Sequence, residues 1–300
     1  MPSFGSYQDL CTLSPLSVCP YLGDKLGSYP PCYARSMSFG SAVIFEVAAL
    51  IVFVVTLILC IFMIYSIKTK YTAIGRKEMV IFFYLYMLQV CFEFVLLSGI
   101  IPTYHVIYPY FAAAHVGLIT ACCWSLFLNG FVGFQFIEDG TALSLWSIRL
   151  TSLGVFLGSG FVAVATFINF AGLNGRFTLP LFSIHILFNG VLLLIYYITQ
   201  LVLVFKTLDD RWPIGSITLS GFAFVLGQVL LLLLSNKICN LADHYFDGLF
   251  FESLCTMVSV MMLYKYWDSI TKEDLEFYIG GKPNQWEVKE LLDDNENNFY

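Results

Sequence analysis

Charged residues are scarce in this 300-residue sequence: they make up only 12% of it, while 58% is hydrophobic. A soluble domain of this size usually carries about twice that share of charge. The scarcity excludes an ordinary water-soluble protein, and the long apolar runs indicate a membrane protein. A basic excess is also missing, since the net charge is −6. We therefore expect the lipid bilayer, and not nucleic acid, as a partner.

Motifs of common enzyme classes are missing too. The stretch "GLNGRF" (172–177) lacks the Lys-Ser/Thr pair and strand context of a phosphate-binding loop. No Gly-x-Ser-x-Gly elbow is present, and none of the four histidines has a nucleophile in a recognisable pattern. We predict that the chain is not an enzyme and has no catalytic residue, no cofactor and no metal.

Seven apolar runs are long enough, or nearly so, to cross a bilayer, which takes ~20 helical residues. Because lipid offers the backbone no hydrogen-bond partner, each run should be a helix. The predicted fold is all-α, a polytopic membrane protein with seven transmembrane helices in one bundle. The expected spans are 41–66, 79–100, 110–134, 145–170, 180–205, 215–235 and 246–264.

The basic residues predict the orientation of this bundle. With these spans, 11 of the 15 Lys and Arg residues fall on the side that holds the C-terminus. Positive charge collects in cytoplasmic loops, so we expect a lumenal N-terminus and a cytosolic C-terminus. No cleavable signal peptide is visible. The expected parts are a lumenal segment (1–40), the seven-helix domain (41–264) and an acidic cytosolic tail (265–300).

Four cysteines lie outside the spans, and the topology places all four on the non-cytosolic side. They are Cys11, Cys19, Cys32 and Cys239. An even number of cysteines in an oxidising compartment predicts two disulfides. Three pairings are possible, and in each of them Cys239 joins the N-terminal segment. Free thiols in a loosely ordered segment are the alternative.

Ionisable residues inside the spans form one layer near the lumenal edge. With 1.5 Å per residue, they lie ~7–11 Å below that edge. The members of this polar layer are Glu46, Glu93, His115, His185 and Glu252. Such residues are costly in a membrane and often functional, so a lumenal cavity, a proton relay or a metal site is one interpretation.

A structural or partner-facing role is the interpretation that we favour for this layer. Its members are shallow, and no Glu-x-x-His or His-x-x-x-His spacing within one helix supports a metal. Asp247 stands at the start of the last span, where an acid complements the helix dipole, so we expect a helix-start acid there.

Several short stretches resemble the fungal chitin synthase export chaperone family, and they occur in the same order. They are "PCYARS" (31–36), "KYTAIGR" (70–76), "ACCW" (121–124), "EDGT" (138–141), "GQVL" (227–230), "DGLFF" (247–251), "MMLYKYWD" (261–268) and "EDLEF" (273–277). The resemblance covers about residues 10–277. It implies a seven-span protein of the endoplasmic reticulum membrane that assists folding and vesicle export of a polytopic chitin synthase. Such a protein supports cell-wall chitin synthesis without being a glycosyltransferase.

Asp274 and Glu276 form an acid-x-acid pattern in the expected cytosolic tail. The pattern resembles di-acidic export signals read by the vesicle coat, so a coat cargo adaptor is a candidate second partner. Chance occurrence in an acidic tail is the alternative.

Two rival functions share this topology. A seven-helix receptor is disfavoured because "FVGFQFIEDGT" (131–141) lacks a Glu/Asp-Arg-Tyr triplet and the last span lacks an Asn-Pro-x-x-Tyr end. A transporter or channel that uses the polar layer is disfavoured because no inverted repeat and no pair of broken helices is evident.

Overall fold

The structure, a computed structural model, describes residues 7–22, 30–39, 42–71, 73–134, 140–170, 172–175, 177–207 and 211–280. Seven segments of 21 to 28 residues are long and apolar enough to cross a membrane. They are α2 (Val47–Thr69), α3 (Arg76–Leu97), α4 (Tyr108–Val132), α5 (Ala142–Phe167), Leu179–Lys206, α8 (Trp212–Leu232) and the first part of α10 (Gly248–Gly280). The described residues thus form the expected helical bundle, with seven helical segments that could cross a membrane.

The fifth of these segments combines three elements. A short α6 (Leu179–Phe182) leads into a single π-helical turn, η2 (Ser183–Phe188), which continues as α7 (Asn189–Thr207). Asn189 Nδ2 donates to the His185 carbonyl oxygen at 3.0 Å. A side-chain donor inserted into the backbone ladder is a common companion of such a local widening.

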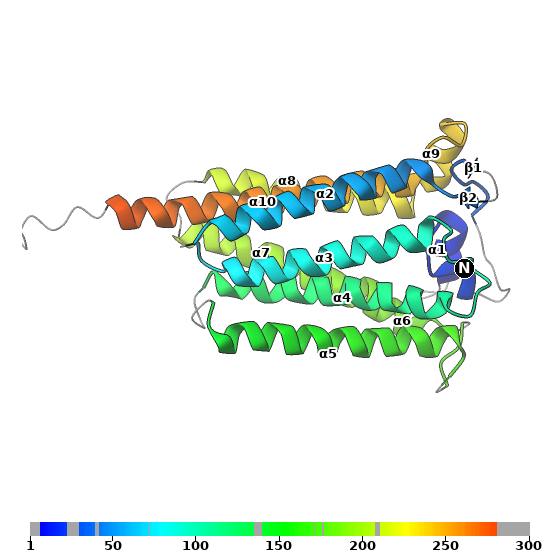
Figure 1. The fold of residues 1–300 in the computed structure, drawn as a ribbon, viewed down its shortest axis with the longest axis horizontal. Coiled ribbons are helices and arrows are strands. Elements are labelled where there is room, and N and C mark those ends of the chain that lie inside the picture. The colour runs from blue at the N-terminus through cyan, green and yellow to red at the C-terminus, as the bar shows by residue number, and fades with distance from the viewer. Residues whose placement is uncertain are drawn as a thin grey trace, which may run out of the picture.

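The short elements gather at one end of the bundle, on the right in Figure 1. They are α1 (Tyr7–Leu13), the 3₁₀ turn η1 (Cys19–Tyr21), the antiparallel strands β1 (Met37–Phe39) and β2 (Ala42–Ile44), and α9 (Ser235–Leu241). We call this the capped end and the other the open end. At the open end α10 runs on beyond its neighbours (Figure 1).

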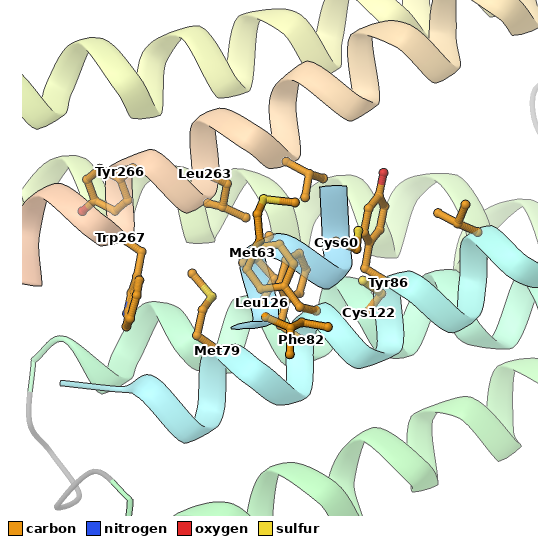
Figure 2. Close-up of a cluster of buried hydrophobic side chains, with 14 of the residues drawn as sticks. Cys60, Met63, Met79, Phe82, Tyr86, Cys122, Leu126, Leu263, Tyr266 and Trp267 are labelled. Carbon is orange, nitrogen blue, oxygen red and sulfur yellow. The ribbon is translucent and has the colours of Figure 1, made fainter. Parts of the chain in front are cut away.

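Helix α4 packs against α3, α5 and α7, and α10 packs against α8 and α2. Helices α2 and α3 connect these two groups. The main hydrophobic core lies between them, and Figure 2 shows part of it: Cys60, Met63, Met79, Phe82, Tyr86, Cys122, Leu126, Leu263, Tyr266 and Trp267. The core therefore draws on helices that are far apart in sequence.

Helix α5 lies along one edge of the bundle (Figure 1). Exposed side chains recur along it at helical spacing: Leu143, Trp146, Leu150, Leu153, Leu157 and Phe161. An exposed apolar stripe of this length would be a liability in water. It fits a helix that faces hydrocarbon, as the sequence predicts for a span.

Small residues allow close helix packing in α8 but not in α5. An added Cβ at Gly227 would lie 2.9 Å from Cys255 Cβ and 3.3 Å from the Glu252 carbonyl oxygen. Nearby, Ser220 Oγ donates to the Ser259 carbonyl oxygen at 2.9 Å. By contrast, an added Cβ at Gly154 or Gly158 would meet nothing within 4 Å among the described residues. The α8–α10 contact therefore uses its small residues, whereas the Gly154/Gly158 spacing serves no contact inside this bundle.

The first span begins later than the expected residue 41. Ala42–Ile44 pairs with Met37–Phe39 as a strand, and α2 starts at Val47. Between them Glu46 adopts a left-handed conformation with φ 52°, which turns the chain from strand into helix. Hydropathy alone joins Ala42–Ile44 to the apolar run, because strand and span residues are apolar alike. The last helix ends later than expected, since α10 continues past residue 264.

Substituting Gly227 with Ala should destabilise the bundle, because the new methyl group meets the backbone of α10. We expect an unfolding free energy lower by about 1–3 kcal/mol, the usual cost of overpacking. Thermal unfolding of the detergent-solubilised protein measures it. Gly215→Ala is the matched control on the same helix, because a Cβ there meets nothing within 4 Å. Equal melting temperatures for the two variants would contradict the packing argument.

Candidate functional site

Glu93 and His115 face each other between α3 and α4, towards the capped end. Glu93 Oε2 lies 3.8 Å from His115 Nε2. Gln89 Nε2 donates to Glu93 Oε2 at 2.9 Å and lies 3.4 Å from His115 Nε2. Each of these polar side chains would be costly alone in an apolar bundle, so their mutual contacts stabilise the α3–α4 pair.

Glu252 has its partners on α8 and on its own helix. Its Oε1 atom accepts hydrogen bonds from Gln228 Nε2 at 3.2 Å and from Thr256 Oγ1 at 2.8 Å. Gln228 lies in "GQVL" and Glu252 directly follows "DGLFF", so these two stretches meet at the α8–α10 contact. Glu252 therefore lies inside a helix contact, with both of its donors supplied by the bundle.

His185 contacts the N-terminal segment. The Tyr7 hydroxyl lies 2.7 Å from His185 Nδ1, and the two rings stack. Tyr7 N–H donates to Thr178 Oγ1 at 3.3 Å. The Tyr7 side chain is fully buried, and this burial raises the pKa of its hydroxyl. The hydroxyl is thus held in its neutral form as a hydrogen-bonding group.

Glu46 and Asp247 occupy the turns that start α2 and α10. Asp247 Oδ1 accepts the Phe250 N–H at 3.1 Å, so Asp247 has the expected role of a helix-start acid. Burial raises the pKa of Asp247. Glu46 is buried as well and interacts electrostatically with Asp247 and Glu93.

Among the described residues, the polar layer combines locally paired side chains with a few buried atoms that have no hydrogen-bond partner. Within the described part of the chain, three buried atoms of this region lack a hydrogen-bond partner: Glu46 Oε2, His115 Nδ1 and Asp247 Oδ2. The local pairs of the layer, between α3 and α4 and between α8 and α10, agree with a structural role.

The N-terminal segment packs into the capped end, which sequence reasoning missed. Its apolar side chains share a second core with α4, α5 and α6 through Tyr7, Cys11, Val18, Cys19 and Leu22. Tyr108 Oη donates to the Ser17 carbonyl oxygen at 3.0 Å, and Tyr21 Oη donates to the Thr103 carbonyl oxygen at 2.7 Å. Apolar residues between the cysteines indicated that the segment is buried, but a short segment without periodicity does not predict what it packs against.

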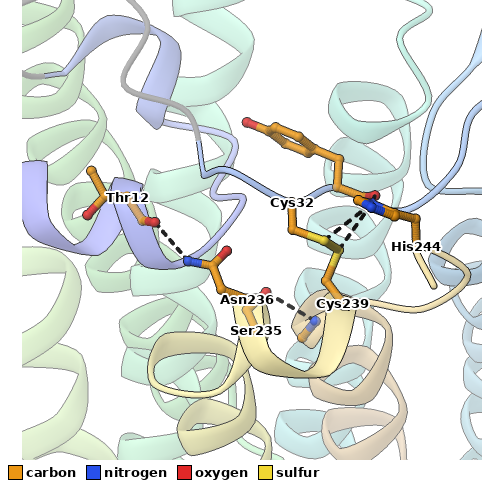
Figure 3. Close-up of a disulfide and its surroundings, with 8 residues drawn as sticks. Thr12, Cys32, Ser235, Asn236, Cys239 and His244 are labelled. Atoms are coloured by element: carbon orange, nitrogen blue, oxygen red, sulfur yellow. Dashed lines mark hydrogen bonds between the residues drawn. A yellow bond between two sulfur atoms is a disulfide. The ribbon is translucent and has the colours of Figure 1, made fainter. Parts of the chain in front are cut away.

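Two disulfides fix the capped end. Cys11 pairs with Cys19, with Cα atoms 5.5 Å apart, and Cys32 pairs with Cys239, with Cα atoms 6.0 Å apart. Figure 3 shows the second disulfide beside His244, with Asn236 donating to the Thr12 carbonyl oxygen at 3.0 Å. The second bridge ties the N-terminal segment to the connection between α8 and α10.

One group among the described residues brings three potential metal-ligand atoms within 4.8 Å of one another: Cys32, Cys239 and His244. Both sulfur atoms are already bonded to each other, so they are not thiolate ligands in this state. The carboxylates and histidines of the polar layer form no such group in the described structure.

Three of the quoted stretches converge at the open end. Glu78, two residues after "KYTAIGR", is fully buried and accepts hydrogen bonds from Gly140 N–H at 2.7 Å and Ser144 Oγ at 2.9 Å. Gly140 belongs to "EDGT" and has φ +67°, a conformation that favours glycine. Sequence reasoning missed Glu78, because an acid in the first turn of a helix looks like an ordinary helix-start residue.

The stretch "MMLYKYWD" of α10 meets the same region. Trp267 Nε1 donates to the Ile74 carbonyl oxygen at 3.2 Å, and Asp268 forms an ion pair with Lys70. Tyr266 Oη donates to Gln200 Oε1 at 2.9 Å. The first interhelical connection, the "EDGT" loop and the end of the last span are thus held together by buried or half-buried polar contacts.

Asp274 and Glu276 follow this region on α10. The backbone of α10 continues as helix to Gly280, but the two side chains lie outside the described residues.

The geometry defines a class of protein before any comparison. Seven apolar helices form a bundle whose polar side chains contact one another across helices and whose N-terminal segment is fixed by disulfides. Polar contacts join helices at both ends of the bundle. It is the architecture of a polytopic membrane protein whose polar side chains contact one another across helices.

A family model described as "Chitin synthase export chaperone" matches residues 3–281. Proteins of that name are similar over nearly the whole chain. The one from Coccidioides immitis is 46% identical over 299 residues, covering 98% of this chain and 90% of the relative. The one from Fusarium oxysporum is 47% identical over 298 residues, covering 97% and 89%. The one from Neurospora crassa is 44% identical over 298 residues, covering 97% and 83%.

This chain belongs to the chitin synthase export chaperone family. The family assignment suggested by its short sequence stretches is thereby confirmed. No solved structure matches the chain.

Glu78→Gln should destabilise the open end, because a neutral amide replaces a buried carboxylate that accepts two hydrogen bonds. We expect a loss of about 1–3 kcal/mol in unfolding free energy. Thermal unfolding in detergent measures it. Lys77→Gln is the matched control, since Lys77 is exposed and donates to the carbonyl oxygen of the same Gly140 at 3.1 Å. The control should change stability by less than about 0.5 kcal/mol, and a larger loss for it than for Glu78→Gln would refute the argument.

Proposed function

We propose that this protein is a non-enzymatic membrane chaperone that assists folding and export of a chitin synthase from the endoplasmic reticulum. Chitin formation in the cell wall would then depend on it indirectly. One observation carries the proposal: relatives named chitin synthase export chaperone are 42–47% identical over 96–99% of this chain.

The physical basis of such a role is the cost of unpaired polar groups in lipid. A polytopic client has spans whose polar or poorly packed faces are expensive until they find a helix to pack against. A dedicated bundle lowers that cost by offering its own outward helix faces during assembly. Helix α5 contributes an outward apolar face of about five turns, from Leu143 to Phe161.

The polar layer supports a structural contribution to this role. Glu46 and His115 are each only 5% exposed, and Glu252 has both of its hydrogen-bond donors within the bundle. A surface for a client needs accessible groups, whereas these groups are enclosed by α2, α3, α4, α8 and α10. We infer that the layer orients the helices and that the client contacts outward faces.

The proposed orientation puts the capped end in the lumen and the open end in the cytosol. Both disulfides lie at the capped end, which supports an oxidising compartment there. Lys68, Lys70, Arg76 and Lys77 lie at the open end, which supports a cytoplasmic face. These observations favour an endoplasmic reticulum membrane location.

Deleting the gene should leave the chitin synthase in the endoplasmic reticulum, because its spans would lack the helices that cover them. Imaging of a fluorescently tagged synthase, together with its co-purification with this protein, measures the effect. Re-expression of the natural chain is the control and should restore delivery. Normal delivery of the synthase in the deletion strain would overturn the proposal.

We further propose that Asp274 and Glu276 form an export signal read by a vesicle-coat cargo adaptor. Replacing both with Ala should slow exit from the endoplasmic reticulum by severalfold, because the adaptor would lose two carboxylates. A vesicle-budding assay on isolated membranes measures exit. The matched control is Asp293→Ala with Asp294→Ala, which removes the same charge further along the tail. Equal exit rates for the two double variants would discard the signal.

A further inference from the structure

Two disulfides with equal burial have different surroundings. The four cysteines are each 0–2% exposed. Cys11 and Cys19 lie in the apolar cluster formed by the N-terminal segment, beside Tyr7 and Leu22. Cys32 and Cys239 instead lie under an exposed imidazole, with His244 Nδ1 at 3.3 Å from Cys32 Sγ and 3.8 Å from Cys239 Sγ (Figure 3).

The imidazole has its proton on the nitrogen that faces the sulfur atoms. His244 Nδ1 lies 3.1 Å from the Tyr33 carbonyl oxygen. A carbonyl oxygen only accepts hydrogen bonds, so Nδ1 must be the donor. The Nδ1–H group therefore donates to the Tyr33 carbonyl oxygen and has Cys32 Sγ as a second nearby acceptor. A protonated nitrogen so close to sulfur lowers the cost of forming a thiolate there.

The backbone around His244 is strained and ties both halves of the bridge together. Asp243 and His244 both adopt left-handed conformations, with φ 50° and 66°, which are uncommon for non-Gly residues. His244 N–H donates to the Cys239 carbonyl oxygen at 3.0 Å, and Arg35 N–H donates to the His244 carbonyl oxygen at 2.8 Å. Arg35 also stacks on Tyr245, with its guanidinium carbon 4.4 Å from the ring centroid.

These backbone contacts do not depend on the sulfur–sulfur bond. After cleavage, the hydrogen bonds on either side of His244 would still hold the Cys32 segment against α9. The two sulfur atoms would stay near each other and near the imidazole, so the bridge could close again. Cleavage of the Cys32–Cys239 disulfide would therefore leave the Cys32 segment in place.

We propose that Cys32, Cys239 and His244 form a thiol–disulfide exchange site whose substrate class is a dithiol. This inference does not depend on the chaperone function. It assigns Cys239 as the sulfur that is attacked and Cys32 as the leaving sulfur, because the imidazole is nearer to Cys32. His244 is the group that protonates the leaving sulfur.

The exchange balances in two steps. One thiolate of the dithiol attacks Cys239 Sγ, a new sulfur–sulfur bond forms, and the bond to Cys32 breaks. Cys32 Sγ takes the electron pair and a proton from the His244 imidazolium. The second thiolate of the dithiol then attacks the first sulfur of the same dithiol and releases Cys239 as a thiolate. The dithiol is oxidised by two electrons, and the protein disulfide is reduced by two.

The exposed side of the site is the route for a thiol. Cys32 and Cys239 are buried, but His244, whose Nδ1 lies 3.3 Å from Cys32 Sγ, is an exposed residue, so the site adjoins the surface. The Cys11–Cys19 bridge has no comparable group, since its described surroundings are the packed apolar cluster. It serves as an internal reference with the same cysteine burial.

Reduction of the intact, detergent-solubilised protein with dithiothreitol tests the site. Alkylation at timed intervals and mass spectrometry follow each disulfide separately. We expect Cys32–Cys239 to open at least about tenfold faster than Cys11–Cys19, because a positioned acid usually contributes 10-fold or more. Equal rates, or faster opening of Cys11–Cys19, would overturn the proposal.

The monothiol glutathione identifies the attacked sulfur. It should stop at a mixed disulfide, because it lacks the second thiol. We expect the glutathione adduct on Cys239 and a free thiol on Cys32. An adduct chiefly on Cys32 would contradict the assignment of the leaving sulfur.

His244→Asn removes the imidazole acid but keeps the backbone conformation, because Asn tolerates a left-handed backbone. Opening of Cys32–Cys239 should slow on the order of 100-fold, while Cys11–Cys19 is unaffected. His105→Asn, an exposed histidine at the same end, is the control and should change neither rate. An unchanged rate of Cys32–Cys239 opening in His244→Asn would sink the proposal.

Discussion

A polar group inside an apolar bundle must find a hydrogen-bond partner, and this constraint shapes the whole molecule. Lipid cannot supply a partner, so each buried donor or acceptor restricts which helix can lie beside which. Glu93 with His115 fixes α3 against α4, and Glu252 with Gln228 fixes α10 against α8. Apolar contacts alone would leave such helices free to slide, because lipid tails are as apolar as the helix faces.

The same constraint operates at the two ends of the bundle through different chemistry. At the open end, the buried carboxylate of Glu78 holds the loop at Gly140, and Trp267 reaches the carbonyl of Ile74. At the capped end, disulfides hold the N-terminal segment, which is too short to fold alone. Covalent bridges suit the end that we place in an oxidising compartment.

Sequence reasoning succeeded where the signal was local and failed where partners were distant. Apolar runs predicted the spans because every helix in lipid must be long and apolar. The start of the first span was placed too early, because Ala42–Ile44 is as apolar as the helix that follows. Glu46 was expected within that span, yet it occupies the left-handed turn before it. Glu78 was overlooked, because its partners lie more than 60 residues away.

The sequence by itself determined the class of the molecule: seven apolar helices, a scarcity of charge, and loop cysteines confined to one predicted side. These follow from composition and length, which the bilayer constrains directly. Only the tertiary structure decided which cysteines pair, which acids are enclosed and which helix faces point outward. Those choices depend on contacts between residues far apart in the chain, such as Cys32 with Cys239, and no local pattern encodes them.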